Sequence, residues 1–236
     1  MSDRDELARA SMVVGGVVAA RLRARPIRAT GKRAVDVLLA TTAMLVLLPL
    51  FIVATVLVRG TSRGPTFFRQ TRVGRDMRPF EMWKFRTMYE DSDDAIHREF
   101  VAGLREDIPS DRVDGQDIYK LTHDPRITPL GRWLRRLSVD ELPQLINVLQ
   151  GTMSLVGPRP ALSWELELFG TLPRYPDRFA VKPGITGLWQ VSGRGMLTMR
   201  EAVALDAEYA DRRSFGLDLL ILLRTIPAVL GRRGAF

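Results

Sequence analysis

The sequence contains no cysteine, and only two of its 236 residues are histidines, His97 and His123. Without cysteine the chain has no disulfide bond, no thiolate metal site and no cysteine nucleophile. Two histidines are too few for a histidine-rich metal site. The first ten residues, MSDRDELARA, carry acids and lack a clean basic start, so we expect no cleaved signal peptide.

The chain has fewer acidic than basic residues: 27 Asp plus Glu against 35 Lys plus Arg, a formal net charge of +8. This excess indicates a polyanionic partner, which could be nucleic acid, a phosphorylated substrate or an anionic membrane. The basic residues flank an apolar segment instead of alternating with exposed aromatic residues on a soluble platform, as a nucleic-acid surface would require. We therefore expect no nucleic-acid partner.

One long segment lacks charge altogether. Residues 37–58 contain no charged side chain, within the run AVDVLLATTAMLVLLPLFIVATVLV at 34–58. A membrane-spanning helix needs about 20 apolar residues, so this run is a membrane candidate. The alternative is a wholly buried core helix, which we favour less because soluble helices of this length usually have a polar face.

Pro49 lies near the middle of this run and removes a backbone hydrogen bond, so the helix should kink or break there. Each arm is then too short to cross about 30 Å of hydrocarbon. The flanking basic residues are Arg21, Arg23, Arg25, Arg28, Lys32 and Arg33 before the run, and Arg59, Arg63, Arg69, Arg72 and Arg75 after it. Basic residues on both sides favour the cytoplasmic side for both ends. We therefore predict a re-entrant membrane helix over 32–60, with a single span as the alternative.

Residues 65–88, PTFFRQTRVGRDMRPFEMWKFRTM, have the pattern of a β-hairpin with two aromatic-rich strands around VGRDMRP. Alternation along the second strand places Phe80, Met82, Lys84 and Arg86 on one face. Lys84 and Arg86 are then neighbouring cations. They are either part of a site or a solvated basic edge that discourages aggregation.

Residues 90–124 are acidic and irregular in pattern. They lack the glycine and the closing glutamate of a calcium-binding loop, so we predict a helix followed by a solvated loop. This insertion could contact a neighbouring subunit in a homodimer. The segments at 153–162 and 181–195 are rich in turn residues, and we predict a connector and a loop there. Residues 200–213 have a helical pattern. Residues 214–234 are apolar with Pro227 inside, which suits an interfacial helix or an ordinary kinked core helix.

The adjacent acids Asp140 and Glu141 lie between two predicted helices, a basic one from about Leu130 and one that ends before Gly151, with a break near Leu137 and Ser138. Ser138 and Glu141 match the capping-box pattern, which would make the acids structural. Pro143 disfavours that register because its ring would clash with a carbonyl inside the helix.

A helical wheel sets the polar face of this second helix apart from its apolar stripe. The stripe is formed by Leu142, Leu145, Ile146 and Leu149, and Asp140, Gln144 and Asn147 lie opposite it. Asp140 therefore points toward solvent or a site. Adjacent carboxylates can share Mg²⁺ with phosphate oxygens. The cations that could clamp those phosphates are Lys84, Arg86, Arg135, Arg136 and Arg159. The residues alone allow both interpretations of the two acids, a structural helix start and a phosphate-binding site.

Several motifs occur together in one order: KRAVD, the proline-interrupted run, KFRTM, DPRITPLGRWLRRLSVDELPQLINVLQGTMSLVGPRP, KPGITGLWQVSGR, and Asp206 with Tyr209. In this combination the chain resembles the monotopic phosphoglycosyl transferases, bacterial sugar transferases that begin glycan assembly on a polyprenyl phosphate. The resemblance covers the chain from about Lys32 onward. Larger members carry several spanning helices before the catalytic part, so we expect the short form here.

The resemblance implies a UDP-sugar donor, a polyprenyl (undecaprenyl) phosphate acceptor, Mg²⁺ as cofactor and release of UMP. It implies that Asp140 is the nucleophile and that Glu141 and Asp140 hold the metal. The implied substrate residues are Lys84, Arg86, Arg135 and Arg159 for phosphates, and the Pro-Arg-Pro element Pro158, Arg159 and Pro160 for the nucleotide. Its membrane setting would be the cytosolic face of the bacterial cytoplasmic membrane, with its anionic lipids. The sugar is left open, and a silent scaffold for glycan enzymes is the alternative function.

Residues and resemblance together predict a mainly α protein with a small β-hairpin. We expect a monotopic membrane protein with a proline-broken re-entrant helix hairpin and interfacial amphipathic helices. The expected organisation is a lead-in over 1–31 that is amphipathic or disordered, the re-entrant helix over 32–60, and a cytosolic catalytic domain over 61–236 that contains the acidic insertion.

Overall fold

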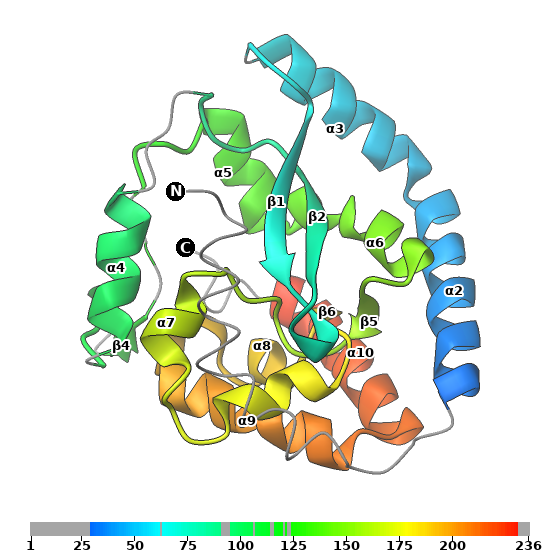
Figure 1. The fold of residues 1–236 in the computed structure, drawn as a ribbon. Helices are drawn as coiled ribbons and strands as arrows, with labels where there is room; N and C mark the ends of the chain where they lie inside the picture. Colours follow the sequence, from blue (N-terminus) through cyan, green and yellow to red (C-terminus); the bar gives the residue numbers. More distant parts are fainter. Residues whose placement is uncertain are drawn as a thin grey trace.

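The computed structural model describes residues 29–61, 63–90, 95–105, 107–113, 116–119, 121 and 124–230, and these residues are mainly helical, as predicted (Figure 1). The α-helices are α2 (Ala29–Val46), α3 (Leu48–Thr61), α4 (Ala95–Arg105), α5 (Pro129–Arg136), α6 (Gln144–Gln150), α7 (Glu165–Phe169), α8 (Leu188–Ser192), α9 (Met199–Arg212) and α10 (Phe215–Leu230). Short 3₁₀ helices are η1 (Arg75–Met77), η2 (Val139–Glu141), η3 (Tyr175–Ala180) and η4 (Arg194–Met196). Residues 1–28 of the predicted lead-in lie outside the described residues.

Within the described part of the chain the strands pair into three two-stranded sheets. They are β1 (Phe67–Val73) with β2 (Pro79–Phe85), β3 (Asp111–Val113) with β4 (Gln116–Ile118), and β5 (Ser154–Val156) with β6 (Gly184–Thr186). The first two pairs are antiparallel and the third is parallel. The small predicted hairpin is therefore confirmed as β1–β2, with Phe67 opposite Phe85 and Val73 opposite Pro79.

The apolar run forms the helix pair α2–α3, which bends by 63° (Figure 1). The break lies at Leu47, just before Pro49, which occupies the first turn of α3. A proline there removes an N–H that a helix start does not need, whereas its ring disfavours continuation of the preceding helix. By length and composition alone, no single helix among the described residues reaches what a membrane crossing needs, whereas the bent α2–α3 pair does.

Three charged residues near the start of α2 hold it against the rest of the chain. Lys32 pairs with Asp218 of α10, with 2.7 Å between Nζ and Oδ2. Asp36 is buried and accepts a hydrogen bond from the Ser154 hydroxyl of β5 at 2.8 Å. Arg33 donates to carbonyl oxygens at the end of α6. The KRAVD stretch thus anchors the apolar helix pair to three separate elements.

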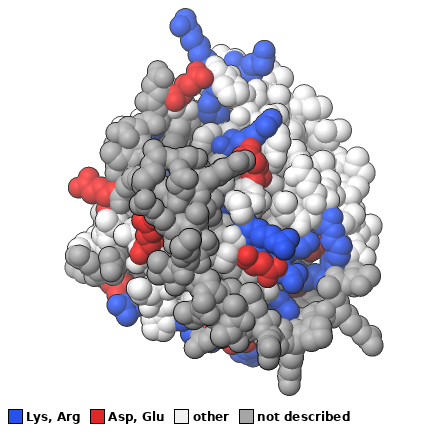
Figure 2. Space-filling view, viewed as in Figure 1, with Lys and Arg blue, Asp and Glu red and all other residues white. Residues whose placement is uncertain are grey.

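Many large apolar side chains of α2 and α3 are exposed. The exposed large apolar residues of α2 and α3 are Leu38, Leu39, Leu45, Val46, Leu48, Leu50, Ile52, Val53, Val56 and Leu57. The upper right of Figure 2, where Figure 1 shows α3, is mostly uncharged. Helix α10 exposes a second apolar set, namely Phe215, Leu219, Leu220, Leu223 and Ile226. Exposed apolar surface on this scale marks an interaction site, such as a membrane contact.

The inner side of α3 packs against the hairpin through aromatic rings. Phe51 lies 4.9 Å from Phe85 between ring centroids, and Phe67 lies 5.4 Å from Phe85. Phe85 is buried in a core cluster that also contains Leu134 of α5 and Val139 of η2. Ring contacts of this kind add to the stabilisation from buried area. The cluster therefore fixes α3, the hairpin and the segment before the two acids relative to one another.

The segment from α5 to α6 confirms the predicted break between two helices. Ser138 has a left-handed backbone with φ of 55° and makes no side-chain cap, so the capping box is absent. Helix α6 begins directly after Pro143, and Asp140 and Glu141 lie in the short η2 turn. The polar face of α6 does not face solvent: Gln144 and Asn147 are buried. Helix α6 contacts β2, whose backbone gives the buried amide of Asn147 its hydrogen-bond partners.

The acidic insertion is more ordered than a helix followed by a solvated loop. It contains α4 and the short β3–β4 pair, and Val101, Leu104 and Ile118 are buried. Val101 and Leu104 join a core cluster with Phe169 of α7 and Tyr175 of η3. The predicted helix is therefore confirmed by α4, whereas the prediction of a solvated loop was wrong for the part that forms the β3–β4 pair, where the apolar side chain of Ile118 is buried.

The two segments predicted as irregular contain strands β5 and β6, and the second also contains helix α8. The strands approach very closely: a Cβ atom added at Gly157 would lie 2.3 Å from the Lys182 carbonyl oxygen. Only glycine permits such contact between backbones. Helix α9 confirms the predicted helix after residue 198, and Thr198 with Glu201 forms a capping box at its start.

Candidate active site

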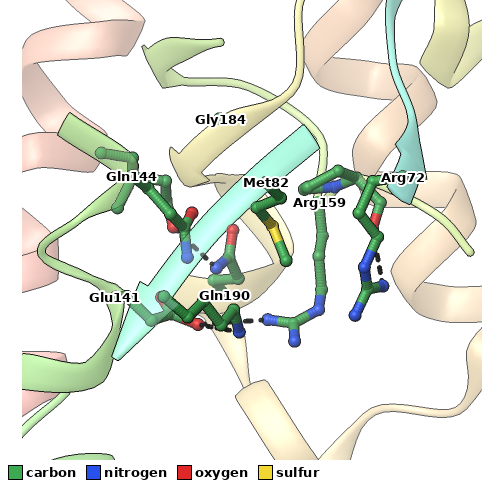
Figure 3. A pocket seen from close by; sticks show the side chains of 10 residues that line it. Arg72, Met82, Glu141, Gln144, Arg159, Gly184 and Gln190 are labelled. Carbon is green, nitrogen blue, oxygen red and sulfur yellow. Dashed lines mark hydrogen bonds and ion pairs between the residues drawn. The ribbon is translucent and has the colours of Figure 1, made fainter. Parts of the chain in front are cut away.

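The centre of the candidate site is a carboxylate held between two cations from different elements. Glu141 of η2 lies 3.3 Å from Lys84 of β2, measured from Oε1 to Nζ. The same oxygen lies 3.7 Å from Nη1 of Arg159. In Figure 3 the side chains of Glu141 and Arg159 point toward one another across the pocket. The structure therefore brings together three of the residues that the sequence predicted as a site.

These residues line a pocket that encloses about 220 Å³ of empty space, part of it open to solvent (Figure 3). The lining residues are Arg72, Met82, Lys84, Glu141, Gln144, Arg159, Pro160, Gly184, Ile185 and Gln190. They come from β1, β2, η2, α6, β6, α8 and the Pro-Arg-Pro segment. Most of its polar groups are basic or amide side chains, which suits a phosphorylated ligand.

Asp140 is buried next to this pocket, with 7% of its surface exposed. Burial raises the pKa of the Asp140 carboxyl, because a charged group loses its hydration there. The positive charges of Lys84, Arg135 and Arg159 act in the opposite direction and lower this pKa, while the negative charge of Glu141 raises it. The pKa of Asp140 is therefore set by opposing effects of burial and neighbouring charges, a situation that is common for groups that take part in reactions.

Lys84 is influenced by the same cluster. Burial lowers the pKa of its amine, and the neighbouring Glu141 carboxylate partly restores it. Met82 and Lys84 both reach the pocket from β2, two residues apart, as strand alternation requires. The alternative that Lys84 belongs to a solvated basic edge does not hold, because its side chain is mostly buried.

Arg86 and Arg135 occupy different surroundings. Arg135 of α5 is exposed and donates from Nε to the Thr87 hydroxyl at 2.9 Å, and its charge reaches Asp140. Arg86 follows the end of β2 and is buried with its guanidinium near Gly64, where an added Cβ atom would lie 2.3 Å from Nη1. Its backbone N–H donates to the Thr66 carbonyl at 3.0 Å, which continues the hairpin by one residue, and Arg86 is not among the residues that line the pocket with Lys84.

The Pro-Arg-Pro segment is held by its carbonyl oxygens. Pro158 and Pro160 have no backbone N–H, so the segment cannot be held by those donors. Four consecutive carbonyls accept hydrogen bonds: Pro158 from Gly184 N at 2.9 Å, Arg159 from Arg178 Nη2 at 2.9 Å, Pro160 from Arg72 Nη1 at 3.2 Å, and Ala161 from Val73 N at 2.8 Å. Arg159 and Pro160 line the pocket, whereas Pro158 and Arg159 border a second hollow of about 160 Å³.

Three residues with polar side chains line the pocket but were not predicted as site residues. Arg72 is buried and donates to the Gln70 side chain and to the Pro160 carbonyl. Gln144 belongs to the polar face of α6, which the wheel placed correctly on the side of Asp140. Gln190 follows Trp189 in α8, and its Nε2 donates to the Ile185 carbonyl at 3.1 Å. The signal for Arg72 was available, because alternation in β1 puts it on the face of the hairpin that carries Lys84, opposite Phe80.

Asp140 and Glu141 offer two carboxylates that could hold Mg²⁺, although no group of three or more His, Cys, Asp or Glu side chains suited to a metal occurs among the described residues. This ion usually binds one or two protein carboxylates together with phosphate oxygens and water. The negative charge of Glu141 is one cause of the raised pKa of Asp140. A divalent cation shared by the two carboxylates would remove that repulsion, and their consecutive positions in η2 keep them close.

Comparison with known proteins gives a match over nearly the whole chain. Residues 27–232 match the family model described as "Bacterial sugar transferase". The chain is 41% identical over 212 residues to the exopolysaccharide production protein ExoY of Sinorhizobium fredii, covering 90% of this chain and 91% of that protein. It is 38% identical over 212 residues to the UDP-glucose:undecaprenyl-phosphate glucose-1-phosphate transferase of Caulobacter vibrioides, covering 87% and 72%.

A further relative is much longer than this chain. The undecaprenyl-phosphate galactose phosphotransferase of Salmonella typhimurium is 40% identical over 209 residues, which is 87% of this chain but 41% of that protein. The family match includes every described element from α2 to α10, and with them Asp140, Glu141, Lys84 and Arg159.

Proposed function

Because the chain belongs to the bacterial sugar transferase family, we propose that it transfers a sugar-1-phosphate from a UDP-sugar to undecaprenyl phosphate. The names of two relatives describe this type of reaction, with glucose in one and galactose in the other. The observation that carries the proposal is the buried carboxylate of Asp140 beside a pocket in which Glu141 meets Lys84 and Arg159. An exopolysaccharide, capsule or O-antigen type of glycan would be the product's destination.

In the first proposed step, a carboxylate oxygen of Asp140 attacks the β-phosphorus of the UDP-sugar. The bond between that phosphorus and the oxygen bridging to the α-phosphate breaks, and UMP leaves with the bridging oxygen. Asp140 then carries the sugar phosphate as an acyl phosphate. Carboxylates act as covalent nucleophiles of this kind in phosphoryl transfer. The cations Lys84 and Arg159 are suitably placed to neutralise charge on the phosphate oxygens.

In the second proposed step, a phosphate oxygen of undecaprenyl phosphate attacks the same phosphorus. The bond to Asp140 breaks, the carboxylate is regenerated, and the lipid leaves as a diphospho-sugar. The environment of Asp140 suits both steps: burial makes the carboxylate a stronger nucleophile for the first, and the charges of Lys84, Arg135 and Arg159 favour its ionised form, which helps it to leave in the second.

Asp140 and Glu141 are the residues proposed to hold Mg²⁺. When bound, Mg²⁺ supplies Lewis-acid polarisation of a phosphoryl oxygen and neutralises developing charge. Glu141 would then have a double role, since it also orients Lys84 and Arg159 through their ion pairs. This division leaves Asp140 as the attacking group.

For the membrane, we propose that α2–α3 enters and leaves the cytoplasmic leaflet as a re-entrant hairpin, with α10 lying at the interface. Supporting observations are the 63° bend, the exposed apolar side chains of both segments, and the basic residues that flank the run. A lipid acceptor requires a catalytic pocket close to the membrane surface. Helix α2 meets that need because it is anchored to β5 and to α6, and α6 begins shortly after Asp140 and Glu141 (the acidic dyad).

The decisive experiment is a screen of UMP release from a panel of UDP-sugars by the full chain in detergent, with undecaprenyl phosphate and Mg²⁺ present. We expect UMP and a lipid diphospho-sugar from at least one donor. A folded protein that is silent across UDP-glucose, UDP-galactose and the N-acetylated donors would contradict the proposal and favour a scaffold role. The panel also identifies the sugar.

A further inference from the structure

A buried ion pair lies behind the Pro-Arg-Pro segment, outside the pocket. Arg178 of η3 donates from Nη2 to the backbone carbonyl of Arg159 at 2.9 Å. The same nitrogen lies 2.9 Å from Oδ2 of Asp206 on α9. Arg178 is nearly inaccessible to solvent, and its guanidinium lies over the Tyr175 ring, 5.0 Å from the centroid. One atom therefore joins α9 to the backbone of a pocket residue.

Asp206 has 1% of its surface exposed, and no described residue donates a hydrogen bond of good geometry to either of its carboxylate oxygens, so its contact with Arg178 is an ion pair. Burial of a carboxylate with so few partners costs stability, and an apolar pair of similar volume would often be at least as stable. Stability therefore gives no reason for this pair. What the pair does supply is a fixed donor for the carbonyl of Arg159.

That carbonyl matters because the flanking prolines remove two backbone donors from the segment. The Arg159 side chain is partly exposed, and its reach to Glu141 is set by where its backbone is held. The neighbouring carbonyl of Pro160 is held by Arg72 in a similar way. Two arginine side chains thus hold two consecutive peptide groups, the one that follows Arg159 and the one that follows Pro160.

We propose that the Arg178–Asp206 pair is a positioning unit that places the Arg159 guanidinium for contact with the donor's phosphates. The proposal rests on the proposed function, because it assigns Arg159 a phosphate to bind. Arg178 and Asp206 touch no substrate in this scheme. They act through the Arg159 backbone, so they are positioning residues and should affect ligand binding only while Arg159 is present.

The test uses UMP, the nucleotide product, with Mg²⁺, and measures its affinity for the full chain in detergent by calorimetry. The variant is the double replacement Arg178→Met with Asp206→Leu, which removes both charges together and so avoids an unpaired buried ion. We expect UMP to bind about tenfold more weakly, the size of one lost charge-assisted contact. Thermal unfolding should show that this variant still folds.

The matched control is Arg174→Met. Arg174 also joins the η3 region to α9, through an ion pair with Asp211, but it is exposed and makes no bond to the Pro-Arg-Pro segment. UMP affinity should be unchanged in this variant. An equal loss in the control would mean that any loosening of η3 from α9 weakens binding, and the positioning role would be overturned.

A double-mutant cycle separates positioning from a general structural effect. Arg159→Ala should itself weaken UMP binding, and adding the double replacement to Arg159→Ala should cause little further loss. Additive losses, or no loss with Arg159→Ala alone, would overturn the inference. A wild-type chain that neither binds UMP nor releases it from any UDP-sugar would instead overturn the proposed function, and with it the role assigned to Arg159.

Discussion

Asn147 accepts a hydrogen bond from the backbone N–H of Trp83, with 3.0 Å between its Oδ1 and the nitrogen. Its Nδ2 donates to the Glu81 carbonyl at 2.6 Å. Asn147 is completely buried, with 0% of its surface exposed. One amide on α6 therefore pairs with both backbone groups around Met82 and fixes β2 against the helix. This contact sets the position from which Lys84 reaches Glu141.

We predict that Asn147→Leu destabilises the protein by about 2–4 kcal/mol, because two buried backbone groups lose their partners at about 1–3 kcal/mol each. Thermal unfolding in detergent measures the loss, and UMP release should fall as well because Lys84 is displaced. The control is Gln150→Leu, an exposed amide on the same helix, which should change neither. Equal stability of the two variants would contradict the role of Asn147.

Asn147 also shows what could not be predicted from the sequence. The wheel placed Asn147 and Gln144 with Asp140 correctly, but it could not tell that this polar face packs on β2 instead of facing water. Periodicity identifies a face, whereas the partner of that face depends on which distant element packs there. The backbone groups of β2 that satisfy Asn147 carry no sequence signal.

For other parts of the fold, too, prediction succeeded where nearby residues determine the structure and failed where distant segments do. The β1–β2 hairpin and the break at Ser138 were predictable, because alternation and a proline act within a few residues. Strands β5 and β6 were missed because three residues are too few for a periodic pattern, and their pairing joins segments about 30 residues apart. Arg72 belongs to the local group, because it lies in β1 opposite Phe80 of the hairpin.

Asp140→Asn should abolish covalent chemistry, because an amide cannot form the proposed acyl phosphate. The sharpest measurement is exchange of radiolabelled UMP into the UDP-sugar without lipid acceptor. Wild-type protein should catalyse this exchange, since the first step is reversible on its own, whereas the variant should not. Absence of exchange in an active wild-type enzyme would point to direct transfer between the two substrates and remove the aspartyl intermediate.

Removal of divalent cations by EDTA should stop UMP release, and added MgCl₂ should restore it. Glu141→Gln should raise the Mg²⁺ concentration needed for half-maximal rate, since one of the two proposed carboxylate ligands becomes neutral. Glu167→Gln, an exposed glutamate on α7, is the control and should leave the Mg²⁺ titration unchanged. Full activity in EDTA would contradict the proposed metal requirement.

The pH dependence of UMP release should report the ionisation of Asp140, whose pKa is raised by burial. The nucleophile must be ionised, so the rate should fall as pH drops through this raised pKa. The positive charge of Lys84 lowers the pKa, and Lys84→Met should therefore raise it further and move the acid limb to higher pH. Arg132→Met, an exposed cation on α5, should not move it. A limb that moves to lower pH would contradict this assignment.

The anchoring of α2 predicts that a residue of the apolar helix pair influences the catalytic elements. Arg33 donates from Nη1 to the Val148 carbonyl at 2.5 Å and from Nη2 to the Leu149 carbonyl at 2.7 Å. The last carbonyls of a helix have no partner within it, and a cation there also interacts favourably with the helix dipole. Arg33 therefore closes the end of α6, whose opposite end follows directly from Asp140 and Glu141.

We expect Arg33→Met to lower the unfolding temperature by several degrees, since a charge-assisted cap of two carbonyls contributes about 1.5–3 kcal/mol and α6 packs on β2. UMP release should fall with it because the same helix orients the dyad. Arg212→Met removes an exposed arginine of α9 that pairs with Glu208 one turn away, and it should alter neither property. If Arg33→Met retained full stability but failed to bind membranes, Arg33 would serve lipid contact instead, and the connection between α2 and the dyad would have to run through Asp36 and β5.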